Sequence, residues 1–378
     1  MQLTAPMDDF GRRARSLWDM DPDVAYLNHG AFGACPRPVL EEQTRLRSQL
    51  QAQPADFFLR RCWYQLDDAR TAVASFLGAD PQGLAFLPNA TTAVAVVLHS
   101  LDLGPGDHVV TTDHVYDAVH NALRARGVEL SVVPVDLDDP DPAATVLAAV
   151  DERTRLVVVD AITSPTAWVL PVEDVVAGCR DRGVLCLVDA AHAPGQLPVD
   201  LAALDADFWV GNLHKWAYSP TGSAVLIARE DLRHRVRPLV VSHLEGYPLA
   251  FDWPGTVDPT AHLAAPTALE LMGQLGWEAV REHGARVAWA GAELLRDRLG
   301  AVLPFDDARS RHAQMVLVDL GLASLADAEA LRERLRLTGI EVGATGWRGR
   351  GYLRLSGAPY NVPDDYERLA DALSREPA

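Results

Sequence analysis

The sequence predicts an α/β protein, with a mainly parallel sheet in a large domain and a small α+β domain at the C-terminal end. Short β-rich apolar runs alternate with amphipathic stretches, as strands and helices do in a doubly wound sheet. The runs at 155–160 and 184–189 are almost continuously apolar, as expected of strands buried on both faces. After Thr260 long helical patterns follow, which indicates a second domain.

The N-terminal 80 residues are mostly helical in pattern, with Pro38 and Pro54 bracketing one helix, and we expect them to pack against the C-terminal part. Turn residues and β-branched runs predict the strands of the large sheet at 84–87, 108–111, 129–135, 155–162, 184–188, 207–210 and 224–228. Amphipathic periodicity predicts intervening helices at 91–101, 116–126 and 173–182.

Helices at 260–274 and 278–299, separated near Gly276, are expected to link the two domains. The small domain is then predicted from strands at 313–320, 340–342 and 352–355 and helices at 325–337 and from 363 onward. We therefore expect an N-terminal segment at 1–25 that packs on the small domain, a large domain at 26–275 and a small domain at 276–378.

Charge and composition limit the kinds of molecule that the protein is expected to bind. The 378 residues include 34 basic and 52 acidic side chains, a balance of −18, so we expect no nucleic-acid or membrane partner. No run approaches the roughly 20 apolar residues of a membrane helix, and no signal-peptide pattern opens the chain, so we expect a cytoplasmic protein. The four cysteines form no CxxC pair and no cluster with histidines, so we expect reduced thiols and no metal site.

A single lysine, Lys215, stands among 33 arginines. Arginine can replace lysine as a surface charge, but only lysine carries an amine that can lose its proton and attack a carbonyl. Asp189 ends one buried apolar run, and Lys215 follows the next. Because ligands of open α/β sheets bind beyond the carboxyl ends of the strands, we expect both side chains to face one pocket.

Eight short motifs occur in order along the chain: YLNHGAFGACP (26–36), PNATTA (88–93), DHVYDA (113–118), TSPTAWVLPV (163–172), DAAHAPG (189–195), NLHKW (212–216), WPGTVD (253–258) and LRLSGAPYN (353–361). Through them the chain resembles fold type I enzymes that depend on pyridoxal 5'-phosphate, in the class V aminotransferase group and its isopenicillin N epimerase-like subgroup. The resemblance implies a fold type I transferase whose large domain binds this cofactor.

The resemblance implies roles for three residues around the cofactor ring. Lys215 would hold the cofactor as a Schiff base and then act as the base at the substrate Cα. Asp189 would pair with the pyridine nitrogen, because a carboxylate there favours the protonated, electron-withdrawing ring. His192 would contact the ring or its phenolic oxygen. The plainer alternatives are a surface lysine, a helix-capping aspartate and a packing histidine.

The cofactor phosphate is expected where a helix opens after a strand, because free N–H groups and the helix dipole attract anions there. The alternative is an ordinary helix cap. From that helix start and from the motif around the lysine, the residues implied to bind the phosphate are Asn89, Ala90, Thr91, Asn212 and His214.

Tyr116 is favoured over His114 as the aromatic residue that stacks on the cofactor, and we count it with Lys215 and Asp189 as catalytic; a half-buried tyrosine at a helix start is the alternative. Thr166 is implied to hydrogen-bond the phenolic oxygen. Thr256 would reach the phosphate of the neighbouring subunit, which implies a homodimer with shared active sites.

Arg354 is expected to bind the α-carboxylate of an amino-acid substrate, because a guanidinium fork suits bidentate carboxylate binding; the alternative is a solvated charge. Asn28 would share that carboxylate. We expect the glycine-rich segment 343–351 to be a mobile loop over the site. The aromatic candidates for the substrate pocket, which are equally consistent with core packing, are Trp63, Tyr64, Trp168, Tyr218, His243, Tyr247 and Trp347.

The resemblance leaves the reaction open. The first hypothesis is epimerisation at the Cα of a small, secondary-metabolite substrate. The second is β-elimination, or oxidative decarboxylation and deamination, of a cysteine S-conjugate in natural-product biosynthesis, and transamination is third. Persulfide chemistry is disfavoured because 339–356 contains no cysteine. A cofactor-binding sensor without turnover is the alternative from another class, although the sequence shows no spare basic domain for it.

Overall fold

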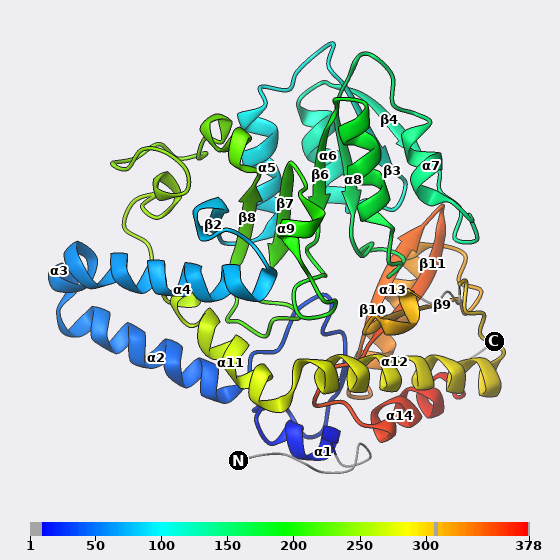
Figure 1. The fold of residues 1–378 in the computed structure, drawn as a ribbon. Helices are drawn as coiled ribbons and strands as arrows, with labels where there is room; N and C mark the ends of the chain where they lie inside the picture. The colour runs from blue at the N-terminus through cyan, green and yellow to red at the C-terminus, as the bar shows by residue number, and fades with distance from the viewer. Residues whose placement is uncertain (1–9, 306–308, 377–378) are drawn as a thin grey trace.

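A seven-stranded sheet forms the centre of the large domain in the computed structural model, which describes residues 10–305 and 309–376 (Figure 1). Its strands are β2 (Leu84–Leu87), β3 (His108–Thr112), β4 (Glu129–Val133), β5 (Thr154–Asp160), β6 (Leu185–Asp189), β7 (Phe208–Asn212) and β8 (Ala224–Ala228). In the order β4-β3-β5-β6-β7-β8-β2, neighbouring strands are parallel except that β8 runs antiparallel to β7 and β2. The predicted mainly parallel sheet is confirmed.

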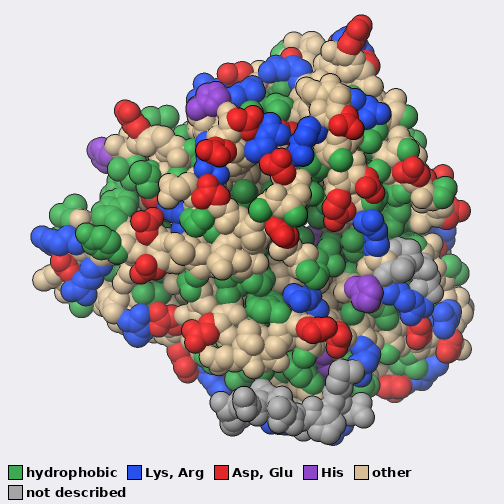
Figure 2. All heavy atoms as spheres, in the orientation of Figure 1, with side chains coloured by type: hydrophobic (Ala, Val, Ile, Leu, Met, Phe, Trp, Pro, Cys, Tyr) green, Lys and Arg blue, Asp and Glu red, His purple; other side chains and the backbone are tan. Residues whose placement is uncertain are grey.

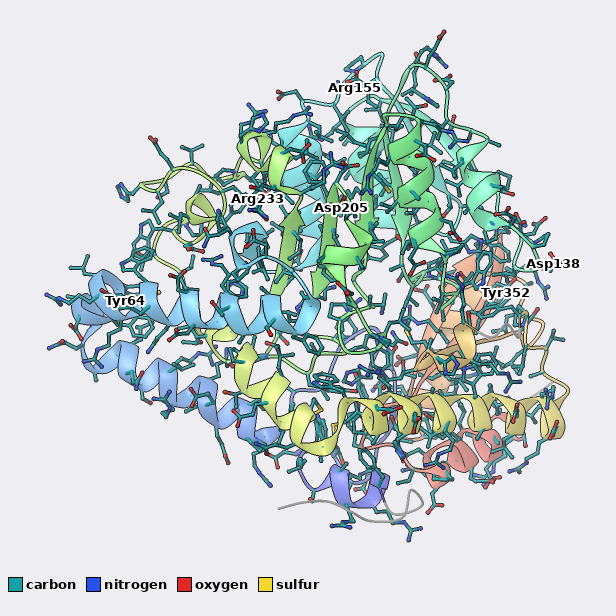
Figure 3. The ribbon with its side chains drawn as sticks, in the orientation of Figure 1. Tyr64, Asp138, Arg155, Asp205, Arg233 and Tyr352 are labelled. Atoms are coloured by element: carbon teal, nitrogen blue, oxygen red, sulfur yellow. The ribbon has the colours of Figure 1, made fainter. Side chains whose placement is uncertain are left out.

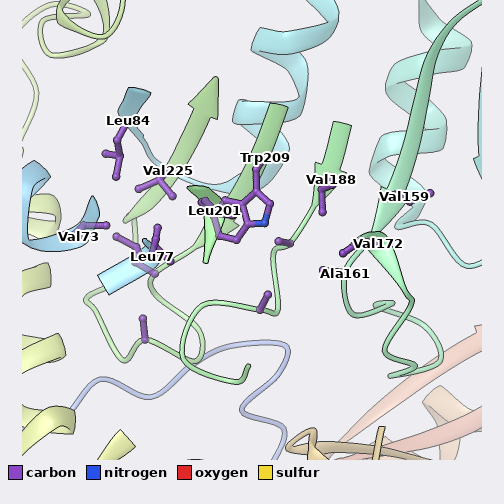
Figure 4. Packing of buried hydrophobic residues seen from close by; sticks show 14 of the residues in the cluster. Val73, Leu77, Leu84, Val159, Ala161, Val172, Val188, Leu201, Trp209 and Val225 are labelled. Carbon is purple, nitrogen blue, oxygen red and sulfur yellow. The ribbon is translucent and has the colours of Figure 1, made fainter. Parts of the chain in front are cut away.

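Helices cover both faces of this sheet. They are α2 (Arg37–Ala52), α3 (Pro54–Asp56), α4 (Cys62–Leu77), α5 (Ala90–Ser100), α6 (Asp117–Ala125), α7 (Pro142–Leu147), α8 (Val172–Asp181), α9 (Leu201–Leu204), α10 (Thr260–Leu263) and α11 (Ala265–Leu275). Residues of α5 and α6 pack on one face. On the other face, Val73 and Leu77 of α4 pack near Trp209 and Val225 of the sheet (Figure 4).

A second sheet, with the order β1-β10-β11-β9, forms the small domain. Its strands are β1 (Ala25–Leu27), β9 (Met315–Val318), β10 (Ile340–Trp347) and β11 (Arg350–Ser356), and its helices are α12 (Trp277–Leu299), α13 (Leu325–Arg336) and α14 (Pro363–Leu373). Together they bury a core of their own. Strand β1 pairs in parallel with β10, so the boundary expected at 26 cuts through a strand of the small domain. Three residues are too few to show a strand pattern in the sequence.

The N-terminal helices do not pack as a group on the C-terminal part. Helices α2 and α4 pack against α10 and α11, because their apolar residues, such as Leu46 and Leu66, join the core beneath the large sheet. They form the arm at the left of Figure 1. The first described helix, α1 (Phe10–Arg15), does pack on the small domain: the ring of Phe10 lies 4.9 Å from that of His283 on α12, and Arg15 pairs with Asp365 of α14 at 3.3 Å.

The glycine-rich segment 343–351 is the tip of a hairpin and not a loop. Strands β10 and β11 pair as far as Trp347 and Arg350, and the two-residue turn between them has φ values of 46° and 77°. Such a turn matches the twist of the flanking strands. A Cβ at Gly351 would lie 2.1 Å from the carbonyl oxygen of Ser324, so this glycine lets the hairpin pack closely against the start of α13.

Acidic and basic side chains intermingle on the face of the molecule shown in Figure 2. Over residues 10–305 and 309–376, none of the helices combines the length and the apolar character needed to cross a membrane.

Candidate active site

A cavity of about 580 Å³ lies where the carboxyl ends of β5, β6 and β7 meet, and the β10–β11 hairpin forms part of its wall. The ends of neighbouring parallel strands share one edge of the sheet, which brings residues from distant parts of the chain together. The predicted site residues that line this cavity are Asn89, Ala90, Thr91, Tyr116, Asp189, His192, Asn212, His214, Lys215 and Arg354.

Lys215 lies in the connection between β7 and β8, and its amine contacts a buried histidine. Its Nζ is 3.2 Å from Nε2 of His192, and the indole Nε1 of Trp216 lies 3.4 Å from Nδ1 of the same ring. Because an indole N–H can only donate, Nδ1 accepts, and a neutral imidazole then carries its proton on Nε2. In its uncharged form the amine of Lys215 can accept the hydrogen bond of that proton.

The electrostatics of the cavity agree with an uncharged lysine. Burial, and secondly the charge of Arg354, lower the pKa of Lys215 from 10.5 to about 7. Burial likewise keeps His192 neutral by holding its pKa well below the ordinary value. An amine with a pKa near neutrality can both give and take a proton under ordinary conditions.

The backbone around Lys215 is fixed by the segment that follows β1. His29 Nε2 lies 3.0 Å from the carbonyl oxygen of Lys215, and His29 Nδ1 lies 2.8 Å from the hydroxyl of Tyr360. A Cβ at Gly33 would lie 2.4 Å from the carbonyl oxygen of His214, so the two backbones touch there. The glycine is required by this close approach.

Asp189 ends β6, and its Oδ1 accepts the backbone N–H of Ala191 at 3.0 Å. Burial raises its pKa, while the N–H of Ala191 and the charge of Lys215 lower it. Asp189 thus contributes a buried carboxyl group to the lining of the cavity.

The start of α5 forms part of the cavity lining. The side chain of Asn89 caps the helix by accepting the N–H of Thr92 at 2.8 Å, and Asn212 Oδ1 accepts the N–H of Ala90 at 2.9 Å. With its oxygen engaged, Asn212 presents its amide nitrogen as a donor. His214 Nδ1 donates to the carbonyl of Ser223 at 2.8 Å, so its other nitrogen donates only when the ring is protonated.

Arg354, on β11, is a buried cation without a carboxylate partner among the described residues. One of its terminal nitrogens donates to the carbonyl oxygen of Ser164, and its Nε is buried with no hydrogen-bond partner in that part of the chain. Burial lowers its pKa to about 10, so it remains charged. A buried guanidinium with a free donor is suited to an incoming carboxylate.

Several predicted residues are not brought to the cavity. The buried hydroxyl of Thr166 is engaged by Nδ1 of His114 at 2.8 Å and by Thr163 at 2.6 Å, so it points into the protein. Thr256 lies exposed and outside the cavity of its own chain, and Asn28 is buried beside the cavity without lining it.

His114 is excluded from stacking on a ligand in the cavity. Its Nε2 donates to the carbonyl of Val135 at 2.7 Å, and its ring stacks on Trp347 with centroids 4.7 Å apart. Tyr116, 47% exposed, is the stacking candidate that does line the cavity.

Of the seven aromatic candidates for the substrate pocket, Trp347 is the one found among the described lining residues. Tyr64 lies on the arm at the left of Figure 3, far from Tyr352 of the small sheet. The sequence pattern marks aromatic residues but carries no information on which core or surface each of them joins.

Asp160 lines the cavity but was not singled out from the sequence. It ends the apolar run of β5 in the same way that Asp189 ends β6. An aspartate closing a buried parallel strand is the signal that would have identified both residues.

The family model for aminotransferase class V matches residues 25–369. The chain belongs to the class V aminotransferase family. This class V enzyme is 33% identical to isopenicillin N epimerase from Streptomyces clavuligerus, over 95% of this chain and 96% of the relative. It is 31% identical to the putative L-cysteine desulfhydrase 1 of Oryza sativa subsp. japonica, over 93% of this chain and 83% of the relative.

Solved structures show the same fold. The class V enzyme superposes on the cystine C-S lyase C-DES with a TM-score of 0.81 at 22% identity, covering 94% of this chain and 99% of the other. With the cysteine desulfurase CsdA from Escherichia coli the TM-score is 0.79 at 20% identity, over 97% and 98% of the two chains. The predicted fold type I architecture is confirmed.

Pyridoxal 5'-phosphate is the cofactor of this class V enzyme. The cavity fits it, because its lining offers the amine of Lys215, the carboxylate of Asp189 and the start of α5. When bound, the cofactor supplies an electron sink for negative charge at the substrate Cα.

Proposed function

We propose that this enzyme removes the Cα proton of a cysteine derivative and expels the sulfur substituent from Cβ, as a C-S lyase. The observation that carries the proposal is the buried amine of Lys215, which lies 3.2 Å from His192 and whose pKa burial lowers to about 7. Such an amine is a base that works near neutral pH.

The cofactor would be held by residues that line the cavity. Lys215 binds it covalently, Asp189 pairs with the ring nitrogen, and the start of α5 with Ala90 and Thr91 receives the phosphate. Asn212 adds a side-chain donor at the same end. Tyr116 covers one face of the ring.

Arg354 would bind the α-carboxylate of the amino acid. Its Nε is buried and has no partner among the described residues, so a carboxylate supplies the acceptor that this donor lacks. With the carboxylate fixed, the substrate has fewer orientations, and its Cα–H bond can face the amine of Lys215. Orientation of this kind lowers the activation barrier of the proton transfer, because the entropy of positioning is already lost when the substrate binds.

Elimination needs a single acid–base group. Lys215, once the substrate's amino group has displaced it from the cofactor, would take the Cα proton; the C–S bond would break with its electron pair going to sulfur, and the proton on Lys215 would pass to the departing thiolate. The three-carbon remainder hydrolyses to pyruvate and ammonia. No cysteine lines the cavity among the described residues, and burial raises the pKa of the nearest motif cysteine, Cys35, to about 12, so a persulfide step at the enzyme has little support.

Epimerisation is the second candidate, and one residue favours it. Inversion at Cα requires a second proton donor on the face opposite Lys215, and the candidate for this role is the hydroxyl of Tyr116, which lines the same cavity. The 33% identity to isopenicillin N epimerase also supports epimerisation as a candidate reaction. We rank elimination first because it needs Lys215 alone, whereas epimerisation needs a second proton donor as well; this order is the reverse of the one expected from the sequence.

The deciding experiment uses the cofactor-loaded enzyme in deuterated water with L-cysteine, cysteine S-conjugates and an α-aminoadipyl peptide. Release of thiol with pyruvate and ammonia supports elimination. Deuterium at Cα in an intact substrate of scrambled configuration supports epimerisation instead. Lys215→Arg abolishes both reactions, whereas Tyr116→Phe lowers epimerisation selectively; full turnover in Lys215→Arg would overturn the proposal.

We also propose that two copies share their active sites. Large apolar side chains are exposed on the arm, with Leu59 69% and Tyr64 75% exposed, and Val241 is 85% exposed. Exposed apolar area of this kind is typical of an interface. Sedimentation should give a dimer, and Thr256→Val should weaken cofactor binding if that loop reaches the neighbouring site.

A further inference from the structure

Two aspartates lie side by side at the floor of the cavity. Asp160 ends β5 and Asp189 ends β6, and the two residues are direct partners in the parallel register of these strands. Both line the cavity, with 2% and 4% of their surface exposed. Partners in register project from the same face of the sheet, so the two carboxyl groups are neighbours.

The two carboxyl groups differ in their hydrogen bonds. Asp189 Oδ1 accepts the N–H of Ala191. Both oxygens of Asp160 are buried, and neither has a hydrogen-bond partner among the described residues. Burial of an ionised carboxylate without hydrogen-bond partners is strongly unfavourable. Burial of the protonated carboxylic acid is much less so, and the acid can donate a hydrogen bond through its O–H group.

The charges around Asp160 come from three sides. Asp189 on β6 opposes its ionisation, whereas Lys215, between β7 and β8, favours it. The backbone N–H groups of Ser164 and Tyr116 also favour ionisation, although neither reaches the geometry of a hydrogen bond to Asp160. Burial outweighs all of these and, with Asp189, holds the pKa of Asp160 well above its ordinary value. Adjacent buried carboxyl groups rarely ionise together.

We infer that Asp160 is a neutral carboxylic acid that donates its O–H to Asp189, so that the pair holds one proton and one negative charge. Asp160 is thus a positioning residue that acts through Asp189. The donated hydrogen bond stabilises the ionised form of Asp189, which is the form that a protonated ring nitrogen needs. This role rests on the proposed use of Asp189, but the shared proton is a property of the chain alone.

The first test is an infrared carboxyl spectrum of the cofactor-free protein at pH 7. The wild type should show the carbonyl band of a protonated carboxylic acid, and Asp160→Asn should lack it. Asp207→Asn is the matched control, because Asp207 is a buried aspartate just before β7 that is paired with Arg229 at 2.7 Å and is not among the residues that line the cavity. Loss of the band in the control, or its persistence in Asp160→Asn, would overturn the inference.

A second test measures whether the charge of Asp189 affects the titration of Asp160. In Asp189→Asn the neighbouring charge is removed, so the band of Asp160 should titrate at lower pH than in the wild type. An unchanged titration would mean that the two groups do not share a proton. Circular dichroism of each variant establishes that the fold is intact.

The third test measures how the hydrogen bond from Asp160 to Asp189 affects the affinity for the cofactor. Asp160→Leu replaces the donor with a larger apolar side chain, and Asp160→Asn keeps an N–H donor. Absorbance titration with pyridoxal 5'-phosphate should give a dissociation constant at least tenfold higher for the leucine variant than for the asparagine variant. Equal constants would exclude donation to Asp189. Because the infrared band is measured without cofactor or substrate, failure of the proposed reaction leaves the inference separately testable.

Discussion

Arg348, at the tip of the small-domain hairpin, donates through Nε to Asp113 of the large domain at 2.7 Å. The same guanidinium donates to Asp136 and lies over the ring of Trp347 at 4.4 Å from its centroid. The hairpin that carries Arg354 is therefore tied to the opposite wall of the cavity at its far end. The segment expected to be a mobile loop is an anchored strand pair.

Arg348→Ala should weaken substrate binding more than it weakens the fold. The ion pair is partly exposed, so its loss should lower the free energy of unfolding by no more than about 1 kcal/mol. The KM for the amino-acid substrate should rise several-fold, because the hairpin loses its tie to the large domain. Arg350→Ala is the control on the same turn, since Arg350 pairs with Asp319 of the small domain. Equal KM values in the two variants would contradict the anchoring role.

Lys215→Met should stabilise the cofactor-free protein in a pH-dependent manner. The folded pKa of about 7 lies below the ordinary 10.5, so between these values the unfolded chain binds a proton that the folded chain lacks. Wild-type stability therefore rises with pH across this window, and the charge penalty is greatest below pH 7. A shift of this size corresponds to roughly 5 kcal/mol.

Urea unfolding of the wild type and Lys215→Met at pH 6, 8 and 9.5 measures this effect. The variant should be more stable at pH 6, and the difference should shrink steadily toward pH 9.5. A difference that stays constant with pH would show that the amine is not buried in a neutral form.

Arg354→Lys should lower kcat/KM by about 100-fold or more, because an ammonium cannot reproduce the forked binding of a carboxylate. Arg354→Met should lower kcat/KM further but leave the cofactor-free protein at least as stable as the wild type, since it removes a buried cation without a carboxylate partner. Steady-state kinetics and thermal unfolding give the two readouts. A large fall in melting temperature for the methionine variant would mean that the guanidinium serves the fold.

Gly33→Ala should disturb the lysine without touching the cavity wall directly. The added Cβ would lie 2.4 Å from the carbonyl oxygen of His214 and 2.8 Å from Cα of Lys215, so one backbone segment must move. We expect a loss of about 1–3 kcal/mol in stability and weaker cofactor binding. Gly104→Ala is the control, because no atom lies within 4 Å of its added Cβ. Cofactor titration and thermal unfolding of both variants make the comparison.

Local patterns predicted much of the fold. The strands that end at Leu87 and Ala228 were placed from β-branched runs and turn residues, and the paired ends of β6 and β7 brought Asp189 and Lys215 to one cavity as expected. These features follow from periodicity and from the geometry of parallel sheets. The cofactor came from motif resemblance, which is information of a different kind.

What the sequence did not predict depends on contacts between distant segments. The three residues of β1 become a strand only because β10 lies beside them. Thr166 belongs to a conspicuous motif, yet its hydroxyl is taken by His114, 52 residues earlier in the chain. The helix expected at 260–274 is interrupted because Pro266 falls in the first turn of α11. Each outcome is set by tertiary packing or by a single residue that overrides a pattern.

The pairing of Ala25 with Ile340 also bears on how the protein is made. At a synthesis rate of 5–20 residues per second, roughly 15–60 s pass between the emergence of the two partners from the ribosome. During that interval the large domain has its whole sheet available, while the segment destined for β1 has no strand to join. The growing chain must therefore keep this segment out of wrong pairings, and the small domain forms as a late, concluding step of biosynthesis.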